Sequence, residues 1–152
     1  MENEELLKKE IYNELLSLFD AYLKKDIDYI KNKFDKSDTI VAFGTDIDEI
    51  IRSHDQWCSF VDNDFKLMEK IEFSEPEHYS VHVSPAGRMG TIICQNKVLI
   101  EMYGQKSSVA TRISVTFKRI DEEWKIVQWM AAFPTEGYSS EELLEEKKPF
   151  AK

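Results

Sequence analysis

The segment from Val115 to Trp129 reads VTFKRIDEEWKIVQW. Apolar and polar residues alternate on both sides of the acidic run at 121–123, as they do in strands that turn one face toward a core. The acidic run suits a tight turn, and Pro134 follows as a strand stop. We therefore expect a β-hairpin whose second strand ends at residue 133.

Alternation of the same kind marks the chain before this hairpin. It predicts strands over residues 71–73, 79–83, 91–103 and 109–118. Before residue 70 the apolar residues recur at spacings of three and four, which is typical of amphipathic helices. These helices are expected over residues 4–25, 26–34 and 47–68, with Asp46 as cap of the third and a short strand at 39–43. Three helices followed by mainly antiparallel strands predict an α+β fold.

The size and charge of the chain limit its organisation and its partners. It has 152 residues, 42% of them hydrophobic, which is enough for one core without disulfides or metals. We expect a single domain over residues 1–138 and an acidic extension over 139–152, where Ser139 and Glu142 can form the capping box of a short helix. The net charge of −9 repels phosphate backbones and anionic lipid surfaces, so neither nucleic acid nor a membrane is expected as a partner.

Two features bear on the location of the protein. The N-terminus lacks the basic and apolar regions of a signal peptide, and no uncharged run is long enough for a spanning helix. Cys58 and Cys94 show no C-x-x-C spacing, which suits free thiols in a reducing compartment. We expect a cytoplasmic protein.

The last predicted strand is apolar on both faces. In a regular strand Trp124, Ile126 and Met130 share one face, while Trp129 and Phe133 lie on the other. A sheet with one wet side alternates more cleanly than this. We therefore expect the helices to cover one face and a partner subunit or the C-terminal extension to cover the other, and we favour a homodimer.

Three stretches of the chain together resemble a known superfamily. They are residues 18–30 with Phe34, residues 41–46, and the hairpin at 115–129. Their order over residues 4–135 is similar to that of the nuclear transport factor 2-like superfamily, and within it to that of the SnoaL-like domains. The resemblance implies three N-terminal helices packed on a curved, mainly antiparallel sheet, which together form a cone with an internal pocket. Members include isomerases, dehydratases, cyclases, binding modules and protein-transport adaptors, so the fold alone does not give the function.

The resemblance permits a test for ketosteroid isomerase chemistry. Those enzymes use a tyrosine on the first helix, an aspartate base near the first strand and a protonated aspartate on a later strand. Alignment places Leu18, Ala42 and Val115 at these positions, and none of them can transfer a proton or donate to an oxyanion. The same alignment turns Trp129 toward the pocket. The resemblance thus implies an apolar pocket without the catalytic set of that isomerase.

His54 is the most informative polar residue, because it lies in the apolar stripe of the third helix one turn before Trp57. It is either an acid–base or ligand-contacting residue, or a core histidine bonded to a carbonyl or carboxylate. Trp57 either stacks on a ligand or fills the cone. The ligand-binding residues that we expect are Leu18, Tyr22, Ala42, His54, Trp57, Val115 and Trp129.

No metal and no cofactor are expected. His78 and His82 are four residues apart, but in a strand this spacing separates them by roughly 13 Å, which is too far for one metal ion. The five glycines are scattered and form no phosphate-binding loop.

Three functions remain open at this point. The one that we favour is the binding or sensing of a small apolar or aromatic molecule, because no catalytic set is evident. The second is an enzyme of the isomerase, hydratase or cyclase type with His54 as its acid–base residue. The third is a dimeric interaction module whose cone is filled by side chains such as Trp57 and Trp129.

Overall fold

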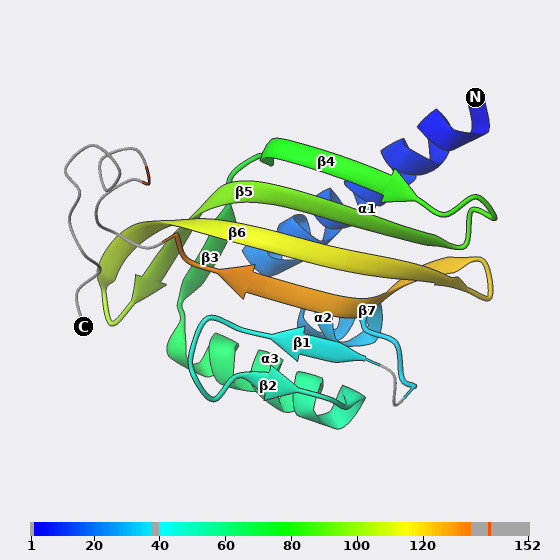
Figure 1. Cartoon of the computed structure of the whole chain (residues 1–152). Helices are drawn as coiled ribbons and strands as arrows, with labels where there is room; N and C mark the ends of the chain where they lie inside the picture. The colour runs from blue at the N-terminus through cyan, green and yellow to red at the C-terminus, as the bar shows by residue number, and fades with distance from the viewer. Residues whose placement is uncertain (1, 38–39, 135–139, 141–152) are drawn as a thin grey trace.

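The computed structural model describes residues 2–37, 40–134 and 140. The helices are α1 (Glu2–Lys24), α2 (Ile27–Lys33) and α3 (His54–Leu67). The strands are β1 (Val41–Phe43), β2 (Ile50–Ile51), β3 (Lys70–Phe73), β4 (Glu77–Val83), β5 (Met89–Met102), β6 (Gln105–Ile120) and β7 (Glu123–Ala132). The predicted α+β cone, with helices packed on a curved and mostly antiparallel sheet, is confirmed (Figure 1).

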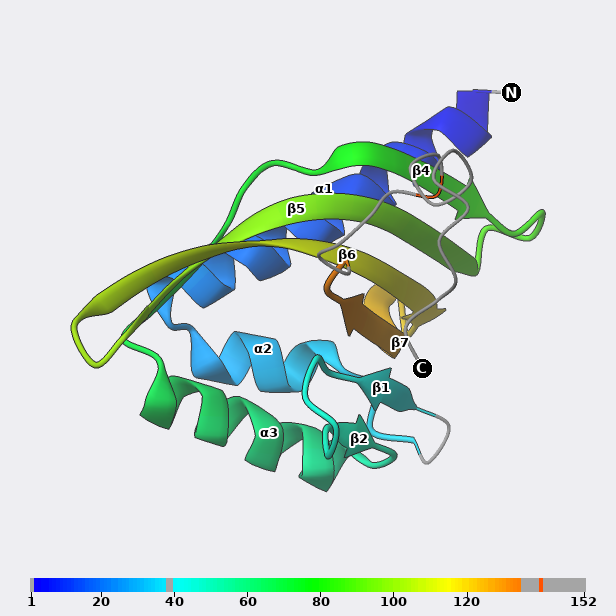
Figure 2. The ribbon, with the colours of Figure 1, turned by 60° about the vertical axis from the view of Figure 1, so that its left-hand side comes forward.

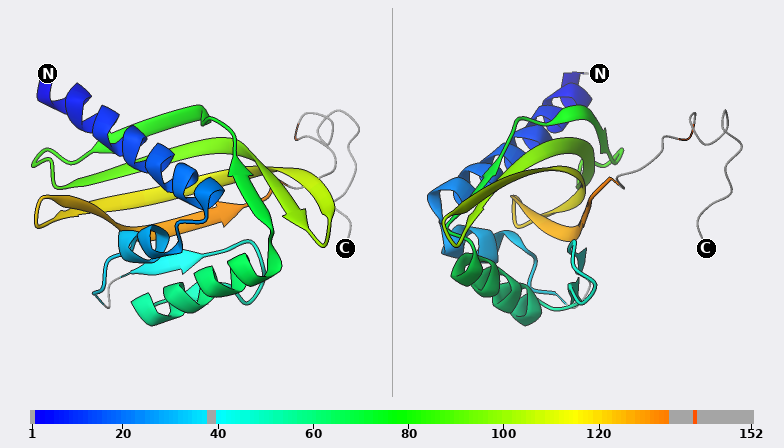
Figure 3. Two further views of the ribbon diagram at one scale, coloured as in Figure 1. Left: turned by 180° about the vertical axis from the view of Figure 1, so that it is seen from behind. Right: turned by 90° about the vertical axis from the view of Figure 1, so that its left-hand side faces the viewer.

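The strands form one sheet in the order β2-β1-β7-β6-β5-β3, and β4 pairs with β5 beside β3. The pairings are antiparallel except that of β1 with β7, which is parallel. The sheet curves around the helices (Figures 2 and 3). Helix α1 contacts β3, β4 and β5, whereas α2 contacts β7 and lies between α1 and α3. This curvature leaves a concave face that the helices cover only in part.

Helix α1 packs closely on β5 through a stripe of buried residues. The stripe consists of Leu7, Ile11, Leu15 and Leu18. Ile11 crosses β5 at Gly90, where an added Cβ would lie 2.7 Å from the Ile11 side chain. The absence of a side chain at Gly90 therefore allows the helix to approach the sheet.

Strand β7 contains a bulge that the sequence pattern does not reveal. Thr116 and Phe117 are adjacent on β6, yet their partners on β7, Gln128 and Ile126, are two residues apart, which leaves Val127 as the extra residue. The bulge moves the core-facing positions of β7 from even to odd residue numbers. This change explains why a regular strand appears apolar on both faces. The apolar pattern therefore does not require both faces of the sheet to be covered, and that expectation stays a prediction.

Helix α3 begins later than predicted. Ser53 is its N-cap, and the Ser53 hydroxyl accepts a hydrogen bond from the backbone N–H of Gln56 at 3.2 Å. Residues 47–52 instead form part of a loop and β2, which pairs with β1, and Ile47 is 98% exposed. The predicted cap at Asp46 is therefore wrong, because apolar residues of the β1–β2 hairpin happen to fall at helical spacing.

The hairpin expected at residues 115–129 is present. Asp121 and Glu122 form its two-residue turn, with φ angles of 49° and 65°. Positive φ at both central residues is the geometry that matches the right-handed twist of the flanking strands. The hairpin pairs β6 with β7, and these two strands form part of one wall of a cavity.

Other features concern the chain ends and the cysteines. The described part of the chain contains no helix that is both long enough and apolar enough to cross a lipid bilayer. Cys58 and Cys94 are free thiols. The short acidic helix predicted within residues 139–152 lies outside the described residues, Ser140 excepted.

Candidate functional site

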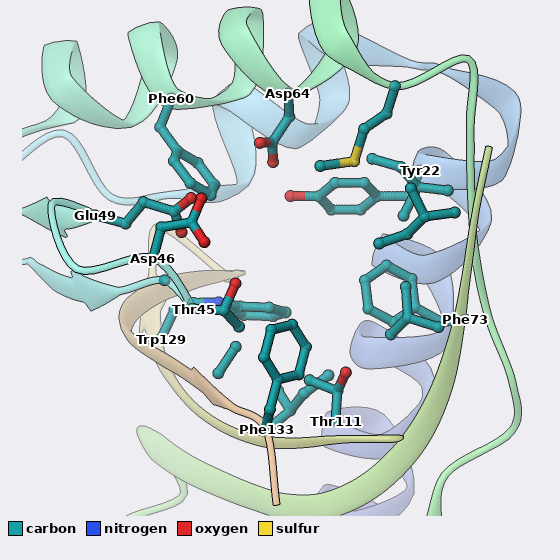
Figure 4. A pocket seen from close by; sticks show the side chains of 17 residues that line it. Tyr22, Thr45, Asp46, Glu49, Phe60, Asp64, Phe73, Thr111, Trp129 and Phe133 are labelled. Atoms are coloured by element: carbon teal, nitrogen blue, oxygen red, sulfur yellow. The ribbon is translucent and has the colours of Figure 1, made fainter. Parts of the chain in front are cut away.

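A cavity of about 250 Å³ lies between the concave face of the sheet and the helices (Figure 4). Inward-facing residues of three neighbouring strands form one wall, and they are Val98, Ile100, Thr111, Ile113, Trp129 and Ala131. They alternate with outward residues, as the two-residue period of a strand requires. The bulge in β7 is what directs Trp129 and Ala131 to this side. The sheet thus supplies a largely apolar wall.

Aromatic rings make up much of the remaining lining. They belong to Tyr22, Phe60, Phe73 and Phe133. Tyr22 packs edge-on against Phe73 with ring centroids 5.4 Å apart, and Phe73 stacks on Phe19 at 4.4 Å. Such contacts hold the rings in fixed positions. The cavity is therefore bounded by ordered aromatic surface.

Three carboxyl groups line the opposite side of the cavity (Figure 4). Asp46 and Glu49 lie on the loop between β1 and β2, and Asp64 lies on α3. The loop is closed by hydrogen bonds from the backbone N–H of Gly44 to the Glu49 carbonyl at 2.9 Å and from Glu49 to the Asp46 carbonyl at 3.1 Å. The Glu49 side chain folds over Gly44, where an added Cβ would lie 1.7 Å from Glu49 Oε2. The glycine thus leaves room for this carboxyl group.

The acidic groups perturb one another and the nearby phenol. Burial, followed by the charges of Glu49 and Asp46, raises the pKa of Asp64 from 3.8 to about 7. Burial is also the main cause that raises the pKa of Glu49, with the charge of Asp46 adding to it. Burial and the carboxylates of Asp64 and Glu49 raise the pKa of Tyr22, which therefore stays a neutral phenol. The cavity disfavours negative charge.

No basic side chain of the described residues offsets this charge. The described residues that line the cavity include no Lys, Arg or His. Among the described residues, no ion pair involves Asp46, Glu49 or Asp64. The same part of the chain has no group of three or more His, Cys, Asp or Glu arranged to hold a metal ion. The three carboxyl groups therefore face the cavity without converging on one metal position.

Thr111 adds an unsatisfied polar group to the sheet wall. It is 4% exposed, and its hydroxyl has no hydrogen-bond partner among the described residues. The neighbouring buried Asn96 is satisfied, because its amide donates to the Ser74 carbonyl at 2.7 Å and accepts from the Cys94 thiol at 3.1 Å. Figure 4 shows Thr111 across the cavity from Asp46 and Glu49. An unpaired buried hydroxyl costs about 1–3 kcal/mol, so its position at a cavity is notable.

The predicted ligand contacts divide between the cavity and the core. Tyr22 and Trp129 line the cavity. Leu18, Ala42 and Val115 are fully buried and are not among the lining residues. Ala42 and Val115 are the register partners of Trp129 on its two sides, and the larger indole is the member of this row that reaches the cavity.

His54 and Trp57 both lie outside the lining. His54 is the first residue of α3, and its Nε2 lies 2.9 Å from the Lys31 carbonyl oxygen. The Trp57 indole donates to the Ile30 carbonyl at 3.1 Å and stacks on Phe34 with ring centroids 3.6 Å apart. These contacts favour the structural alternatives considered for the two residues. A ligand-binding or acid–base role for either stays a prediction.

Asp46, Glu49, Asp64 and Thr111 were not predicted as site residues. Asp64 carried a usable signal, because it stands three residues after Val61 on α3 and four before Met68, the C-cap of that helix, in line with the apolar stripe. A charged residue within such a stripe is rare unless it is paired or functional. The acidic loop gave no such signal, since Asp46 had a plausible alternative role as a helix cap.

Comparison with known proteins identifies the family. The family model for the SnoaL-like domain matches residues 12–136, whereas no curated protein matches the chain. A nuclear transport factor 2 (NTF2-like) superfamily protein from Salmonella enterica subsp. enterica serovar Typhimurium str. LT2 is similar, with a TM-score of 0.74, 18% identity and coverage of 88% of this chain and 99% of that one.

Two further structures are similar in fold. A proposed scytalone dehydratase from Novosphingobium aromaticivorans DSM 12444 has a TM-score of 0.75 at 6% identity, with 89% of each chain covered. The association domain of C. elegans CaMKII has a TM-score of 0.67 at 13% identity, with 86% of this chain and 98% of that chain covered. At such identities the likeness concerns the fold, and the match of the family model over most of the chain shows the membership. The chain therefore belongs to the SnoaL-like domain family.

Proposed function

We propose that this domain binds a small molecule in the cavity, with an apolar or aromatic part of the ligand against the aromatic lining. The observation that carries the proposal is the buried Thr111 hydroxyl on the cavity wall, which has no hydrogen-bond partner among the described residues. Buried polar groups in folded proteins are almost always paired, and a ligand would supply the missing partner. The carboxyl groups of Asp46, Glu49 and Asp64 face the same cavity, and none of them forms an ion pair within the described part of the chain.

The packing of the tryptophans supports ligand binding over a filled cone. Trp57 is held against Phe34 and the Ile30 carbonyl, away from the cavity. Trp129 forms part of the wall and leaves about 250 Å³ unfilled. This volume lies just below the usual range of ligand pockets, about 300–1,000 Å³, and therefore suits a small ligand.

A thermal-stability screen against a metabolite library tests the proposal. A compound at a hundred times its dissociation constant raises the free energy of unfolding by about 2.7 kcal/mol. Ala131→Leu places extra volume in the cavity and should abolish the stabilisation. The control is Ala132→Leu, which changes the adjacent residue of β7 on the outer face and should leave it intact. Stabilisation that persists in Ala131→Leu would place the ligand elsewhere.

A second candidate function, acid–base catalysis, is favoured by Asp64. The pKa of Asp64 is raised to about 7, which suits a group that both takes and gives protons near neutral pH. The Tyr22 hydroxyl points into the same cavity (Figure 4), and one similar structure is a proposed scytalone dehydratase. This candidate transfers the acid–base role from His54 to Asp64. For a bound compound that is turned over, Asp64→Asn should abolish turnover while binding persists; unchanged turnover would exclude the role.

We also propose that the domain forms a homodimer through the outer face of the sheet. A row of residues in register crosses five strands there, and four of its members are exposed apolar side chains. In the order β5, β6, β7, β1 and β2, the row consists of Ile93, Ser114, Met130, Phe43 and Ile50. Each of the four apolar residues is 39% to 53% exposed. Exposed apolar side chains gathered on one face are typical of an interaction surface. The similar CaMKII structure is by name an association domain.

The location proposed for the protein is the cytoplasm. Cys58 and Cys94 are free thiols, which fits a reducing compartment. Fractionation of cells that produce the full chain checks this assignment.

A further inference from the structure

We infer that the ligand of this cavity is a small organic cation, in which an amine or quaternary ammonium group on an aromatic or aliphatic body meets Asp46, Glu49 and Asp64. The inference rests on the proposed function, which is binding in the cavity, and adds the charge of the ligand. It concerns binding and requires no chemical step.

The charge of the cavity favours a cation as its ligand. Three carboxyl groups line it. Within the described part of the chain no basic side chain lines it, and no ion pair neutralises any of the three. The charged neighbours that act on Asp64 are themselves acidic, namely Glu49 and Asp46. Uncompensated charge in a partly buried site is costly. A cation placed among these groups removes their mutual repulsion, whereas an anion adds to it.

The aromatic lining also favours a cation. Rings of Tyr22, Phe60, Phe73, Trp129 and Phe133 surround the space that the carboxyl groups face (Figure 4). The face of an aromatic ring attracts a cation and contributes about 0.5–2 kcal/mol, most for an indole. Rings and carboxylates together are the combination that recognises ammonium groups carried on an apolar body.

Thr111 supplies an independent observation that points to a ligand. Its hydroxyl is buried, unpartnered and on the cavity wall, across from Asp46 and Glu49. A ligand that spans the cavity can place its ammonium group at the carboxylates and a polar group at this hydroxyl. An organic molecule with two ends fits this arrangement better than a metal ion, for which the described residues offer no ligand set.

Isothermal titration calorimetry of the full chain at pH 8 with three probes tests the inference. The probes are phenethylamine, phenethyl alcohol and 3-phenylpropionate, which share an aromatic body and differ in charge. We expect the protonated amine to bind at least about tenfold more tightly than the alcohol, and the carboxylate to show no binding at millimolar concentration. Equal affinity for amine and alcohol would overturn the cationic ligand and leave the proposed binding function standing.

The remaining outcomes are equally decisive. Tighter binding of 3-phenylpropionate than of the amine would overturn the inference, and so would the absence of amine binding up to millimolar concentration. In either case the library screen with Ala131→Leu tests the binding function separately, because it does not depend on the charge of the compound.

Matched variants locate the charge recognition. Asp64→Asn should weaken amine binding at least about fivefold and change alcohol binding less than twofold. Asp62→Asn is the control, since it removes the same charge from the same helix at a carboxylate that pairs with Lys31 at 2.7 Å outside the cavity. Should Asp64→Asn fail to fold, Glu49→Gln serves the same purpose. Equal effects of the Asp64 and Asp62 variants would mean that long-range charge, and not the cavity, attracts the amine.

Discussion

Replacing Asp64 by asparagine should stabilise the ligand-free protein, and should do so more at high pH than at low pH. Asparagine has nearly the shape of a protonated aspartate but cannot ionise. In the wild-type protein, burial and the carboxylates of Glu49 and Asp46 disfavour the ionised form of Asp64. The phenol of Tyr22 faces the same carboxylates and remains neutral throughout. The variant therefore removes a charge that the folded state tolerates poorly.

The pH dependence follows from the direction of the pKa change. The pKa of Asp64 is raised from 3.8 to about 7 on folding, so the folded state holds the proton more tightly than the unfolded state. The contribution of this residue to stability is thus fully present below about pH 4 and is lost as the pH rises through 7. Because one pKa unit corresponds to about 1.4 kcal/mol, the loss reaches about 4 kcal/mol at pH 8, of which about 2–3 kcal/mol develops between pH 5 and pH 8.

Urea unfolding of wild type and Asp64→Asn at pH 5 and pH 8 measures this difference. The free energy of unfolding of the variant, relative to that of the wild type, should increase by about 2–3 kcal/mol from pH 5 to pH 8. For a chain of this size this is equivalent to roughly 5–10 °C in melting temperature. Asp62→Asn, which removes a carboxylate outside the cavity from the partly exposed ion pair with Lys31, should show no such growth. If the free energies of unfolding of wild type and Asp64→Asn differ by the same amount at both pH values, the assignment of a raised pKa to Asp64 is refuted.

Three further predictions concern the fold and its surfaces. Thr111→Val removes an unpartnered buried hydroxyl and should raise the free energy of unfolding by about 1 kcal/mol in urea; a loss of 1 kcal/mol or more would mean that the hydroxyl is paired. Trp57→Ala should lower the free energy of unfolding by about 3–5 kcal/mol, because it opens a cavity beside Phe34, and calorimetry that finds less than 1 kcal/mol would contradict the packing. Met130→Lys places a charge in the exposed apolar row and should convert a dimer to a monomer in light scattering, whereas a wild-type monomer at micromolar concentration would exclude the dimer.

The larger elements could be predicted because their signals are local. The stripe of Leu7, Ile11, Leu15 and Leu18 marks α1, and the acidic turn between β6 and β7 marks the hairpin. The helical stripe spans twelve residues, and the turn is flanked on both sides by alternating strands, so a single exception does not hide either pattern. The family resemblance then supplied the cone, which periodicity alone does not specify.

The details of the cavity depend on contacts between distant residues and were missed for that reason. The bulge at Val127 depends on pairing with β6, and the apolar residues that it places on both faces of a regular strand were attributed to a covered outer face. The Asp46 loop resembles a helix cap in sequence, and only its closure onto β2 brings the carboxyl group to the cavity. Tyr22 and Trp129 were predicted as ligand contacts. Asp64 was not, because the apolar stripe of α3 in which it lies was assigned wholly to the core.

A crystal structure of the protein with the most stabilising compound of the library would show whether the cavity is the ligand site. The compound should lie in the cavity, in contact with Trp129 and Phe73, with a polar or charged group directed at Asp64. A compound bound elsewhere on the protein, with the cavity unoccupied, would contradict this expectation.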